Sequence, residues 1–347
     1  MTNKANDCTA SANAASANAA LADTGKVNTG SVITGSVLVH PQELDKKWID
    51  RCVSLGIPRI GLHPVGGGEA AKSLDDLLCR LKTSEFRSLL DYAVERGLEI
   101  EYEFHAARWC LPASEFEAHP EWMRMNDAGE RVGDLNFCVT NEAALDFYAR
   151  RAVECAKQLY RSGKRFYFWM DDAKGGACRC PKCREYSVSD QQLIVANRVI
   201  SELRREIPDA CLAYLAYVDC MTPPTVKPAD GIFLEFAPIE RDFHKPLDDP
   251  DSEKNRHEIE HLPALLEYFG HDNAKVLDYW LDNSLYSGWK KPPKEFHEYR
   301  DVIAADFKYY RALGIHDLAT FACYLGEDYI ELYGEPDISA FAAELAK

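Results

Sequence analysis

The stretch Arg165-Phe-Tyr-Phe-Trp-Met-Asp-Asp172 runs from an aromatic segment straight into two adjacent carboxylates. A short apolar run of this kind is typical of a buried strand. Carboxylates at a strand end suit acid/base chemistry, because burial or a like charge can keep one protonated while its neighbour stays ionised. The simplest alternative is two solvated turn aspartates, since Asp is common where loops begin.

Seven further short apolar runs along the chain alternate with helical patterns. This alternation predicts parallel βα units, and eight of them predict a single (β/α)8 TIM barrel. Gly56, Gly97, Gly163 and Gly314 each lie between a helical pattern and the next strand, as helix ends require. The predicted strands are residues 37–40, 59–63, 99–105, 166–171, 212–217, 232–236, 276–282 and 318–324, and the last helix is expected at residues 338–345.

A doubly wound open sheet is the competing architecture. It is disfavoured because no Gly-x-Gly-x-x-Gly turn follows the first predicted strand. The run Gly66-Gly67-Gly68 lacks the Lys-Ser/Thr of a phosphate-binding loop. Residues 1–30 are mainly Ala, Ser, Asn, Thr and Gly, so we expect a disordered or loosely attached segment there and a barrel over residues 31–347.

The composition indicates a globular protein whose negative charge mainly serves solubility and fits a neutral or cationic ligand. A net charge of −16 disfavours a nucleic-acid partner, which would require clustered Lys and Arg. No apolar run approaches the ~20 residues needed to span a bilayer. The first residues lack a basic region followed by an apolar core, so the expected location is cytoplasmic, and reduced thiols are expected there.

The carboxyl ends of the predicted strands are polar, and the active site of a (β/α)8 barrel lies at these ends. One such residue alone is most simply a satisfied core residue, but together they predict a ring of hydrogen-bonding groups around one mouth. Nearby tryptophans and tyrosines favour a carbohydrate pocket, because sugar rings offer faces for stacking. The strand-end residues are His40, His63, Glu103, His105, Asp171, Asp172, Tyr217, Asp219, Glu235, Asp278, Asp282, Tyr324 and Glu327.

Glycoside hydrolysis commonly uses two carboxyl groups around an oxocarbenium-like transition state. Adjacent aspartates allow a substrate-assisted version, in which the 2-acetamido oxygen of the sugar attacks the anomeric carbon. One carboxylate then orients the acetamido N–H, and its neighbour protonates the leaving group. The backbone must bend at Asp171-Asp172 for both side chains to face one ligand, because neighbours in a strand point in opposite directions.

The segment Cys178-Arg-Cys-Pro-Lys-Cys183 follows the aspartates directly. Its C-x-C-x-x-C spacing is typical of a zinc site, in which a structural ion takes four ligands. The fourth ligand would come from a distant part of the chain, with Cys138 or Cys110 as candidates. The alternative is three reduced thiols, Cys178, Cys180 and Cys183, that brace a loop without metal.

An ordered series of motifs from about residue 58 to residue 330 resembles a bacterial barrel family labelled a domain of unknown function. That family is associated with α-glucuronidase-like proteins and includes endo-β-N-acetylglucosaminidases. The resemblance implies a glycoside hydrolase that needs no catalytic cofactor and binds an oligosaccharide or glycoside. The motifs are Glu103-Phe-His105, His119-Pro-Glu-Trp122, Leu135-Asn-Phe-Cys-Val-Thr-Asn141, Asp172 with the cysteine cluster, Asn197-Arg198, Leu215-Ala-Tyr217, Pro238-Ile-Glu-Arg241 with His244, and Leu277-Asp278-Tyr279.

Phe168-Trp-Met-Asp171-Asp172 is also similar to the adjacent aspartates of O-GlcNAc hydrolases, which are substrate-assisted enzymes. This likeness implies that Asp171 orients the acetamido group and Asp172 is the general acid/base, in this order or reversed. Trp280-Leu-Asp282-Asn283 resembles their Trp-Asp-Asn segment, although Leu281 interrupts the match. The residues that the two resemblances place around the sugar are Glu103, His105, Glu235, Arg241, Asp278, Trp280, Asp282 and Tyr324.

Two alternatives stay open. A glycosidase for a non-acetylated or uronic-acid sugar would use Asp172 as the acid with Asp278 or Glu235 as nucleophile or base. Arg241 would recognise the uronic acid in that enzyme, or would simply form a structural ion pair. A barrel that binds glycans without turnover is the other alternative, since a fold does not guarantee a function.

Overall fold

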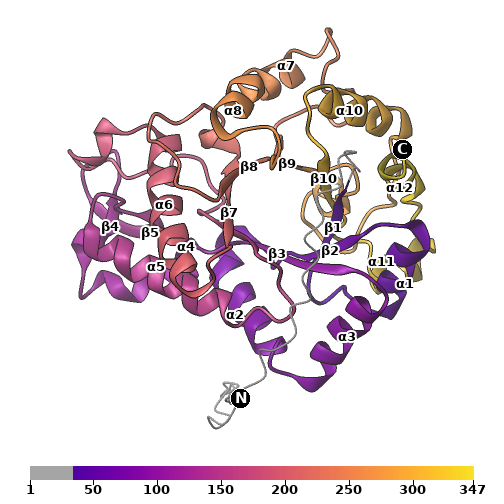
Figure 1. Cartoon of the computed structure of the whole chain (residues 1–347), viewed down its shortest axis with the longest axis horizontal. Helices are drawn as coiled ribbons and strands as arrows, with labels where there is room; N and C mark the ends of the chain where they lie inside the picture. The colour runs from indigo at the N-terminus through magenta and orange to yellow at the C-terminus, as the bar shows by residue number, and fades with distance from the viewer. Residues whose placement is uncertain (1–33) are drawn as a thin grey trace. The chain divides into compact units, whose positions relative to one another are not determined.

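A computed structural model describes residues 34–347, and the segment predicted to be disordered, residues 1–30, lies outside the described residues. Eight parallel strands close into a barrel in the order β1-β10-β9-β8-β7-β6-β3-β2. The predicted (β/α)8 barrel is therefore confirmed, and Figure 1 shows its strands surrounded by helices. The barrel strands are β1 (Ser36–Val39), β2 (Arg59–Leu62), β3 (Glu99–His105), β6 (Arg165–Trp169), β7 (Cys211–Ala216), β8 (Ile232–Phe236), β9 (Lys275–Asp278) and β10 (Asp317–Phe321).

The strands alternate between two hydrophobic layers, as the pleat requires. In β6, Tyr167 and Trp169 point into the barrel interior, where they pack with side chains such as Leu38 and Phe233. Phe168 points outward into the larger layer between strands and helices. Aromatic residues on both faces explain why this strand reads as an unbroken apolar run.

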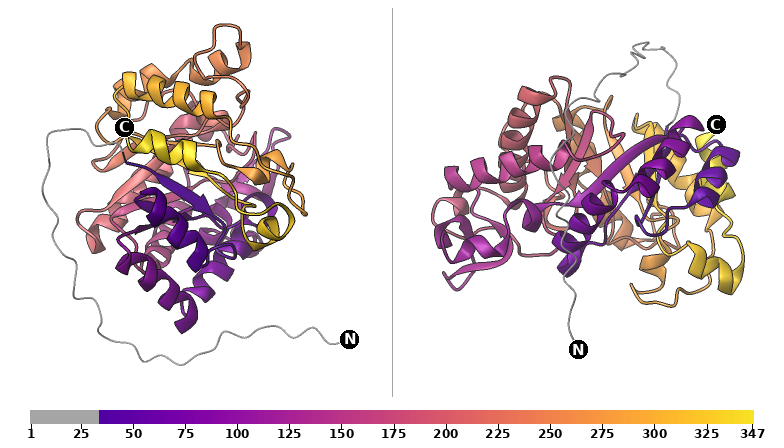
Figure 2. Two further views of the ribbon diagram at one scale, coloured as in Figure 1. Left: turned by 90° about the vertical axis from the view of Figure 1, so that its right-hand side faces the viewer. Right: turned by 90° about the horizontal axis from the view of Figure 1, so that it is seen from below.

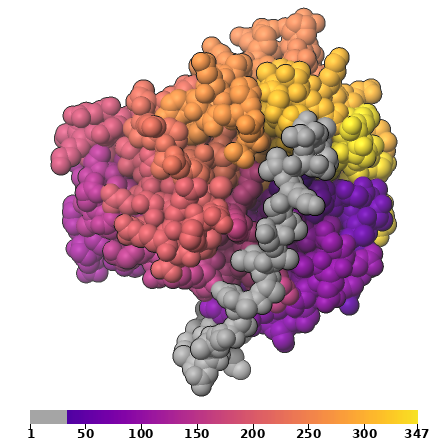
Figure 3. All heavy atoms as spheres, viewed as in Figure 1, coloured from indigo at the N-terminus to yellow at the C-terminus, as the bar shows by residue number. Residues whose placement is uncertain are grey.

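Helices cover the outside of the barrel and join its ends. Gly56 ends the first helix in a left-handed conformation, with φ of 71°, and the first and last helices pack together (Figures 2 and 3). The last helix forms one residue later than expected. The helices are α1 (Lys46–Leu55), α2 (Ala70–Arg80), α3 (Ser84–Glu95), α4 (Ala107–Cys110), α5 (Glu142–Ala156), α6 (Val188–Glu206), α7 (Glu253–Ile259), α8 (Leu262–Phe269), α9 (Asn283–Tyr286), α10 (Arg300–Ala312), α11 (Glu327–Tyr333) and α12 (Ser339–Leu345).

A hairpin between β3 and α5 was not predicted from the sequence. Its strands are β4 (Met123–Met125) and β5 (Arg131–Phe137), which pair antiparallel outside the barrel. The polar sequence of β5 gives no strand pattern, because only Phe137 of this strand is buried. The hairpin brings Asn136 and Cys138 beside the loop that follows β6.

Within residues 34–347, the helices are all too short or too polar to cross a bilayer.

Candidate functional site

A cavity of about 460 Å³ lies at the carboxyl ends of the barrel strands. Among the described residues, two carboxylates line it, Asp172 and Asp282. Tyr217, Tyr279 and Trp169 are among the aromatic groups that form its walls. Predicted residues His105 and Tyr324 also line the cavity, so four of the predicted site residues meet there.

Asp172 faces this cavity from the end of β6. Its Oδ1 accepts a hydrogen bond of 2.7 Å from the hydroxyl of Tyr217. Gly66, in the loop after β2, passes so close that a β-carbon there would lie 3.3 Å from Asp172 Oδ2 and 3.1 Å from the His105 ring. A larger residue at this position would press against two site residues at once, because the backbone passes close to both side chains.

Asp171 points away from Asp172. Its Oδ2 accepts a 2.6 Å hydrogen bond from the Asn136 amide, and its own amide donates 2.8 Å to Asn136 Oδ1. The Arg108 guanidinium lies 3.5 Å from the same carboxylate oxygen. Burial raises the pKa of Asp171, although the Asn136 hydrogen bond opposes the rise. The expectation that both side chains face one cavity is corrected here: the chain bends at Asp172, but the two aspartates line different, adjoining cavities.

Asp171 instead lines a second, small cavity of about 50 Å³. This cavity shares His105, Leu215 and Tyr217 with the mouth cavity. Asp171 Oδ1 is buried and has no hydrogen-bond partner among residues 34–347. A buried carboxylate oxygen without a partner is costly, so this atom is ready to accept a bond from a donor that enters.

Three histidines form a ladder around one side of the mouth. Nδ1 of His40 lies 2.8 Å from the His63 carbonyl oxygen, and Nδ1 of His63 lies 2.8 Å from the Glu103 carbonyl oxygen. Nδ1 of His105 lies 2.6 Å from the Met170 carbonyl oxygen. Because a carbonyl only accepts, each Nδ1 carries the hydrogen and each Nε2 is left as an acceptor.

Burial keeps two of these histidines neutral. It lowers the pKa of His40. Burial and the two neighbouring histidines together lower the pKa of His63 well below its usual value. His40 and His63 therefore offer neutral nitrogen acceptors to a ligand that carries hydroxyl donors.

Asp282 is the second carboxylate at the mouth, and it also caps the short helix α9. Its Oδ1 accepts bonds from the Ser284 amide at 3.0 Å and from the Ser284 hydroxyl at 2.5 Å. Burial raises the pKa of Asp282 to about 6. This side chain can therefore exchange a proton near neutral pH.

Glu103 and Glu235 lie deeper, below the floor of the cavity, where they are fully buried. Both contact the Lys275 ammonium, Glu103 directly and Glu235 at 3.8 Å. Trp169, above them, donates a 2.8 Å bond from Nε1 to Glu235. Their predicted contact with a sugar is corrected, because both carboxyls are buried beside Lys275 and do not line the cavity. Glu235 lies in register with Lys275 on the neighbouring strand.

Arg241, Asp278 and Trp280 form a separate buried group outside the barrel wall. The Arg241 guanidinium contacts Asp278 at 2.9 Å and Asp306 of α10 at 2.7 Å, and Trp280 Nε1 donates 2.9 Å to Asp306. Arg241 and Asp278 have fully buried side chains, so the structural ion pair describes them better than the predicted sugar contact. The predicted stacking role of Trp280 is corrected for the same reason: its ring packs on Phe307.

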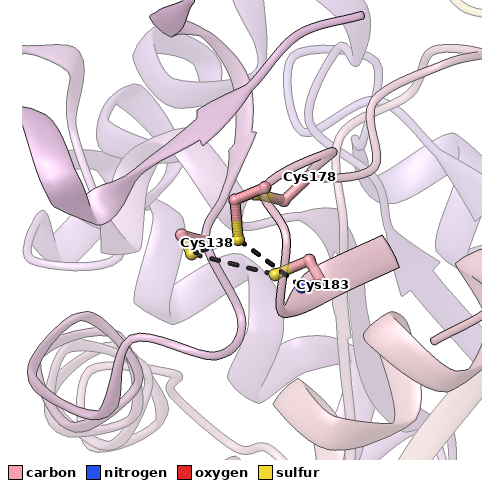
Figure 4. A group of neighbouring side chains, drawn as sticks. Cys138, Cys178 and Cys183 are labelled. Carbon is pink, nitrogen blue, oxygen red and sulfur yellow. Dashed lines mark hydrogen bonds between the residues drawn. The ribbon is translucent and has the colours of Figure 1, made fainter. Parts of the chain in front are cut away.

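Cys138 from the hairpin joins the three cysteines after β6 in a buried cluster that could hold a metal ion. The labelled side chains point toward one another (Figure 4). Of the two candidates for a fourth ligand, Cys138 rather than Cys110 lies at the cluster. The cluster does not line the cavity that Asp172 faces.

A family model described as "Domain of unknown function (DUF4838)" matches residues 81–318, more than half of the chain. The chain belongs to the DUF4838 family. This match agrees with the predicted membership of a family labelled a domain of unknown function. The association of DUF4838 with α-glucuronidase-like proteins, and its activity, stay predictions. No curated protein matches the sequence.

The DUF4838 chain is also similar in structure to known glycosidases. A β-N-acetylhexosaminidase from Bacteroides fragilis matches with a TM-score of 0.55 and 15% identity, over 90% of this chain and 66% of that one. A β-galactosidase from Rahnella sp. R3 matches with a TM-score of 0.54 and 12% identity, over 92% of this chain and 56% of that one. The chain thus spans less than two thirds of either enzyme, and at these identities the likeness shows the fold.

Sequence reasoning missed the backbone strain around the mouth. Among residues 34–347, five positions other than glycine have positive φ. Four of these residues line one of the two cavities described above, and two of the four also line an open groove beside the mouth cavity. Strained conformations cluster at binding sites, but side-chain patterns carry no signal for them. The four are Asn136, Val218, Trp289 and Tyr324.

Proposed function

We propose that this protein is a retaining glycoside hydrolase that cleaves a β-linked N-acetylhexosamine, with Asp172 as the residue that transfers the proton. One observation carries the proposal: the Asp172 carboxylate accepts a hydrogen bond from Tyr217 at the mouth of the barrel. There it lines both the mouth cavity and an open groove beside that cavity. The substrate class is supported by the fold shared with a β-N-acetylhexosaminidase and by the likeness of residues 168–172 to substrate-assisted enzymes.

The two hollows suit a ligand that extends on both sides of the reacting bond. Beside the mouth cavity lies an open groove of about 540 Å³, and the two share Asp172, Tyr217, Ile239 and Trp289. Trp289 is 63% exposed, far more than a packing role requires. An aromatic face of this kind is suited to stacking on a sugar ring. We therefore assign the mouth cavity to the reacting sugar and the groove to the leaving part of the glycan, which corresponds to endo cleavage.

The chemistry follows from the groups around the cavity. The acetamido oxygen of the substrate attacks the anomeric carbon while Asp172 gives its proton to the glycosidic oxygen, so that the glycosidic bond breaks and a bicyclic oxazolinium forms. Water then attacks the anomeric carbon and gives one proton to the Asp172 carboxylate, while the bond between this carbon and the acetamido oxygen breaks. The acetamido group is regenerated, and the second displacement restores the starting configuration. In this proposal the acetamido group of the reacting sugar extends from the mouth cavity toward the small cavity beside it, where its N–H meets the unpaired, buried Oδ1 of Asp171. The two aspartates thus contact one substrate from two adjoining cavities.

The proposed reaction uses no cofactor. Neutral Nε2 atoms of the histidine ladder accept bonds from sugar hydroxyls. Any metal at the cysteine cluster is structural in this proposal, since the cluster lies apart from the mouth cavity.

A second candidate is favoured by the position of Asp282. It lines the same cavity as Asp172 and has a pKa of about 6. A pair formed by Asp172 and Asp282 could hydrolyse a sugar that has no acetamido group, with one acid and one nucleophile or base. This pair replaces the earlier partners Asp278 and Glu235, which are fully buried.

Matched aryl glycosides separate these candidates. Substrate assistance would be supported by hydrolysis of an aryl β-N-acetylglucosaminide and by inhibition with a thiazoline that mimics the oxazolinium. Asp171→Asn should then lose most of the hydrolysis rate and most of the affinity for the thiazoline. Faster hydrolysis of the aryl β-glucoside, with loss in Asp282→Asn, would replace it by the two-carboxylate enzyme. Binding of oligosaccharides without release of any aryl group or sugar at pH 4–8 would leave a glycan-binding barrel.

A further inference from the structure

The geometry of the four-cysteine cluster matches a metal centre. The Cys138 sulfur lies 3.7 Å from that of Cys180 and 3.8 Å from that of Cys183, and the four sulfurs all lie within 4.8 Å of one another. A regular tetrahedron with metal–sulfur bonds of about 2.3 Å has sulfur–sulfur edges of about 3.8 Å. A disulfide would instead bring two sulfurs to about 2.05 Å.

The surroundings of the cluster favour thiolates over thiols. The Met125 amide donates to Cys178 Sγ at 3.3 Å, and the Cys183 amide donates to Cys180 Sγ at 3.5 Å. The Arg131 guanidinium lies 3.9 Å from Cys178 Sγ. Hydrogen-bond donors and a cation directed at sulfur compensate the negative charge of a metal–thiolate centre, as outer-shell groups of metal sites do.

We propose that Cys138, Cys178, Cys180 and Cys183 bind one Zn²⁺ as thiolates and that this ion holds Asp172 in place through Asn136 and Asp171; the second half rests on the proposed function. A tetrahedral centre of four sulfurs is typical of zinc, with iron as the other common occupant. All four coordination positions are taken by protein, so the ion has no open position for catalysis.

The positioning role follows from the chain path. Cys138 lies two residues after Asn136, which exchanges two hydrogen bonds with Asp171. The other three cysteines lie in the segment that follows Asp172 and leads into a short 3-10 helix, Cys183–Glu185. Gln191 of α6 joins the same loop to the helix, since its side chain accepts from the Cys178 amide at 2.9 Å and donates to the Cys183 carbonyl at 3.1 Å. The ion would therefore tie the hairpin, the Asp172 loop and α6 into one unit.

The metal content of the purified protein tests the zinc-binding part of the proposal without any substrate. We expect about one zinc ion per full-length chain, purified in metal-free buffer and measured by mass spectrometry, because a four-thiolate site binds a single ion. Cobalt-loaded protein should show the visible absorption of tetrahedral cobalt thiolate. The matched variants are Cys138→Ser, expected to lose the metal, and Cys211→Ser on β7, outside the cluster, expected to keep it. Metal-free wild-type protein, or iron in place of zinc, would overturn the assignment.

Amide hydrogen exchange tests whether the ion holds Asp172 in place through Asn136 and Asp171. The amides of Asn136 and Asp171 are the two donors of the reciprocal pair, so removal of zinc from the wild-type protein by a chelator should speed exchange in peptides over residues 134–140 and 168–176. Peptides from β1 and β2 should not change. If exchange at the reciprocal pair is unaffected by metal removal, the ion does not position this loop. Neither readout depends on hydrolysis, so a failure here is distinct from a failure of the proposed activity.

Discussion

Replacement of Lys275 by Met should destabilise the barrel strongly, and more so at high pH. The Lys275 ammonium is fully buried beneath the cavity and contacts Glu101 at 3.0 Å, Glu103 directly and Glu235 at 3.8 Å. Glu101 keeps a second partner, Arg59, at 2.8 Å. Glu103 and Glu235 have no other cation within salt-bridge distance among the described residues, so the variant leaves two buried carboxyls uncompensated.

The expected loss of unfolding free energy is about 3–5 kcal/mol at pH 7, the range found when one partner of a buried ion pair is removed. Burial already raises the pKa of Glu235 to about 7 and raises that of Glu103 well above its usual value. Without the ammonium both carboxyls prefer the neutral form still more strongly, so the loss should shrink as the pH falls to 5 and both take up protons. The variant should therefore differ from wild type more at pH 8 than at pH 5.

Urea unfolding followed by circular dichroism at pH 5 and pH 8 measures the loss of unfolding free energy and its dependence on pH. Lys157→Met is the matched control, since Lys157 pairs with Glu206 at 2.8 Å on the surface with about half of each side chain exposed. Its loss should stay below about 1 kcal/mol at either pH. A Lys275→Met variant as stable as this control, or one whose loss is independent of pH, would refute the reasoning.

Three further changes probe the mouth. Asp282→Asn removes a carboxyl whose pKa burial raises from 3.8 to about 6; the stability of wild type falls as pH rises through this window, so between pH 4 and 7 the variant should gain about 2 kcal/mol relative to wild type, and a constant difference in denaturant unfolding would contradict it. Tyr217→Phe removes the 2.7 Å bond to Asp172 and should lower kcat at least tenfold while the unfolding free energy falls by only about 1 kcal/mol; an unaltered kcat would separate Tyr217 from the reaction. Trp289→Ala should raise KM about tenfold for an oligosaccharide but not for a small aryl glycoside, and equal effects on both would remove the groove from substrate binding.

The barrel was predictable because each strand is a short apolar run with its own turn residues. Arg165–Trp169 is one case: five residues with aromatic groups on both faces could be little else than a buried parallel strand. The hairpin of β4 and β5 was missed since its strands have few buried residues and so lack the apolar alternation of a strand packed on a core.

The site was predicted in part. The strand-end rule predicted Asp172, His105, Asp282 and Tyr324 at one mouth, and they line one cavity because parallel strands end on the same side of the barrel. Their roles in binding or catalysis stay predictions. How deeply a strand-end side chain is buried, and in which direction it points, were harder to predict. Glu235 pairs in register with Lys275, and Asp278 faces Arg241 and α10, which depends on strand register and helix packing that a single sequence does not encode locally.

The central claim, that Asp172 transfers the proton in a glycosidase, is tested most directly by the leaving-group dependence of Asp172→Asn. The rate on an N-acetylglucosaminide with a poor leaving group should fall about 10²–10⁴-fold, the usual contribution of a general acid, whereas a dinitrophenyl leaving group should lose far less. Asp209→Asn, at the opposite end of β7 and largely exposed, should keep wild-type rates on both. Equal rates for Asp172→Asn and wild type on the poor leaving group would contradict the account.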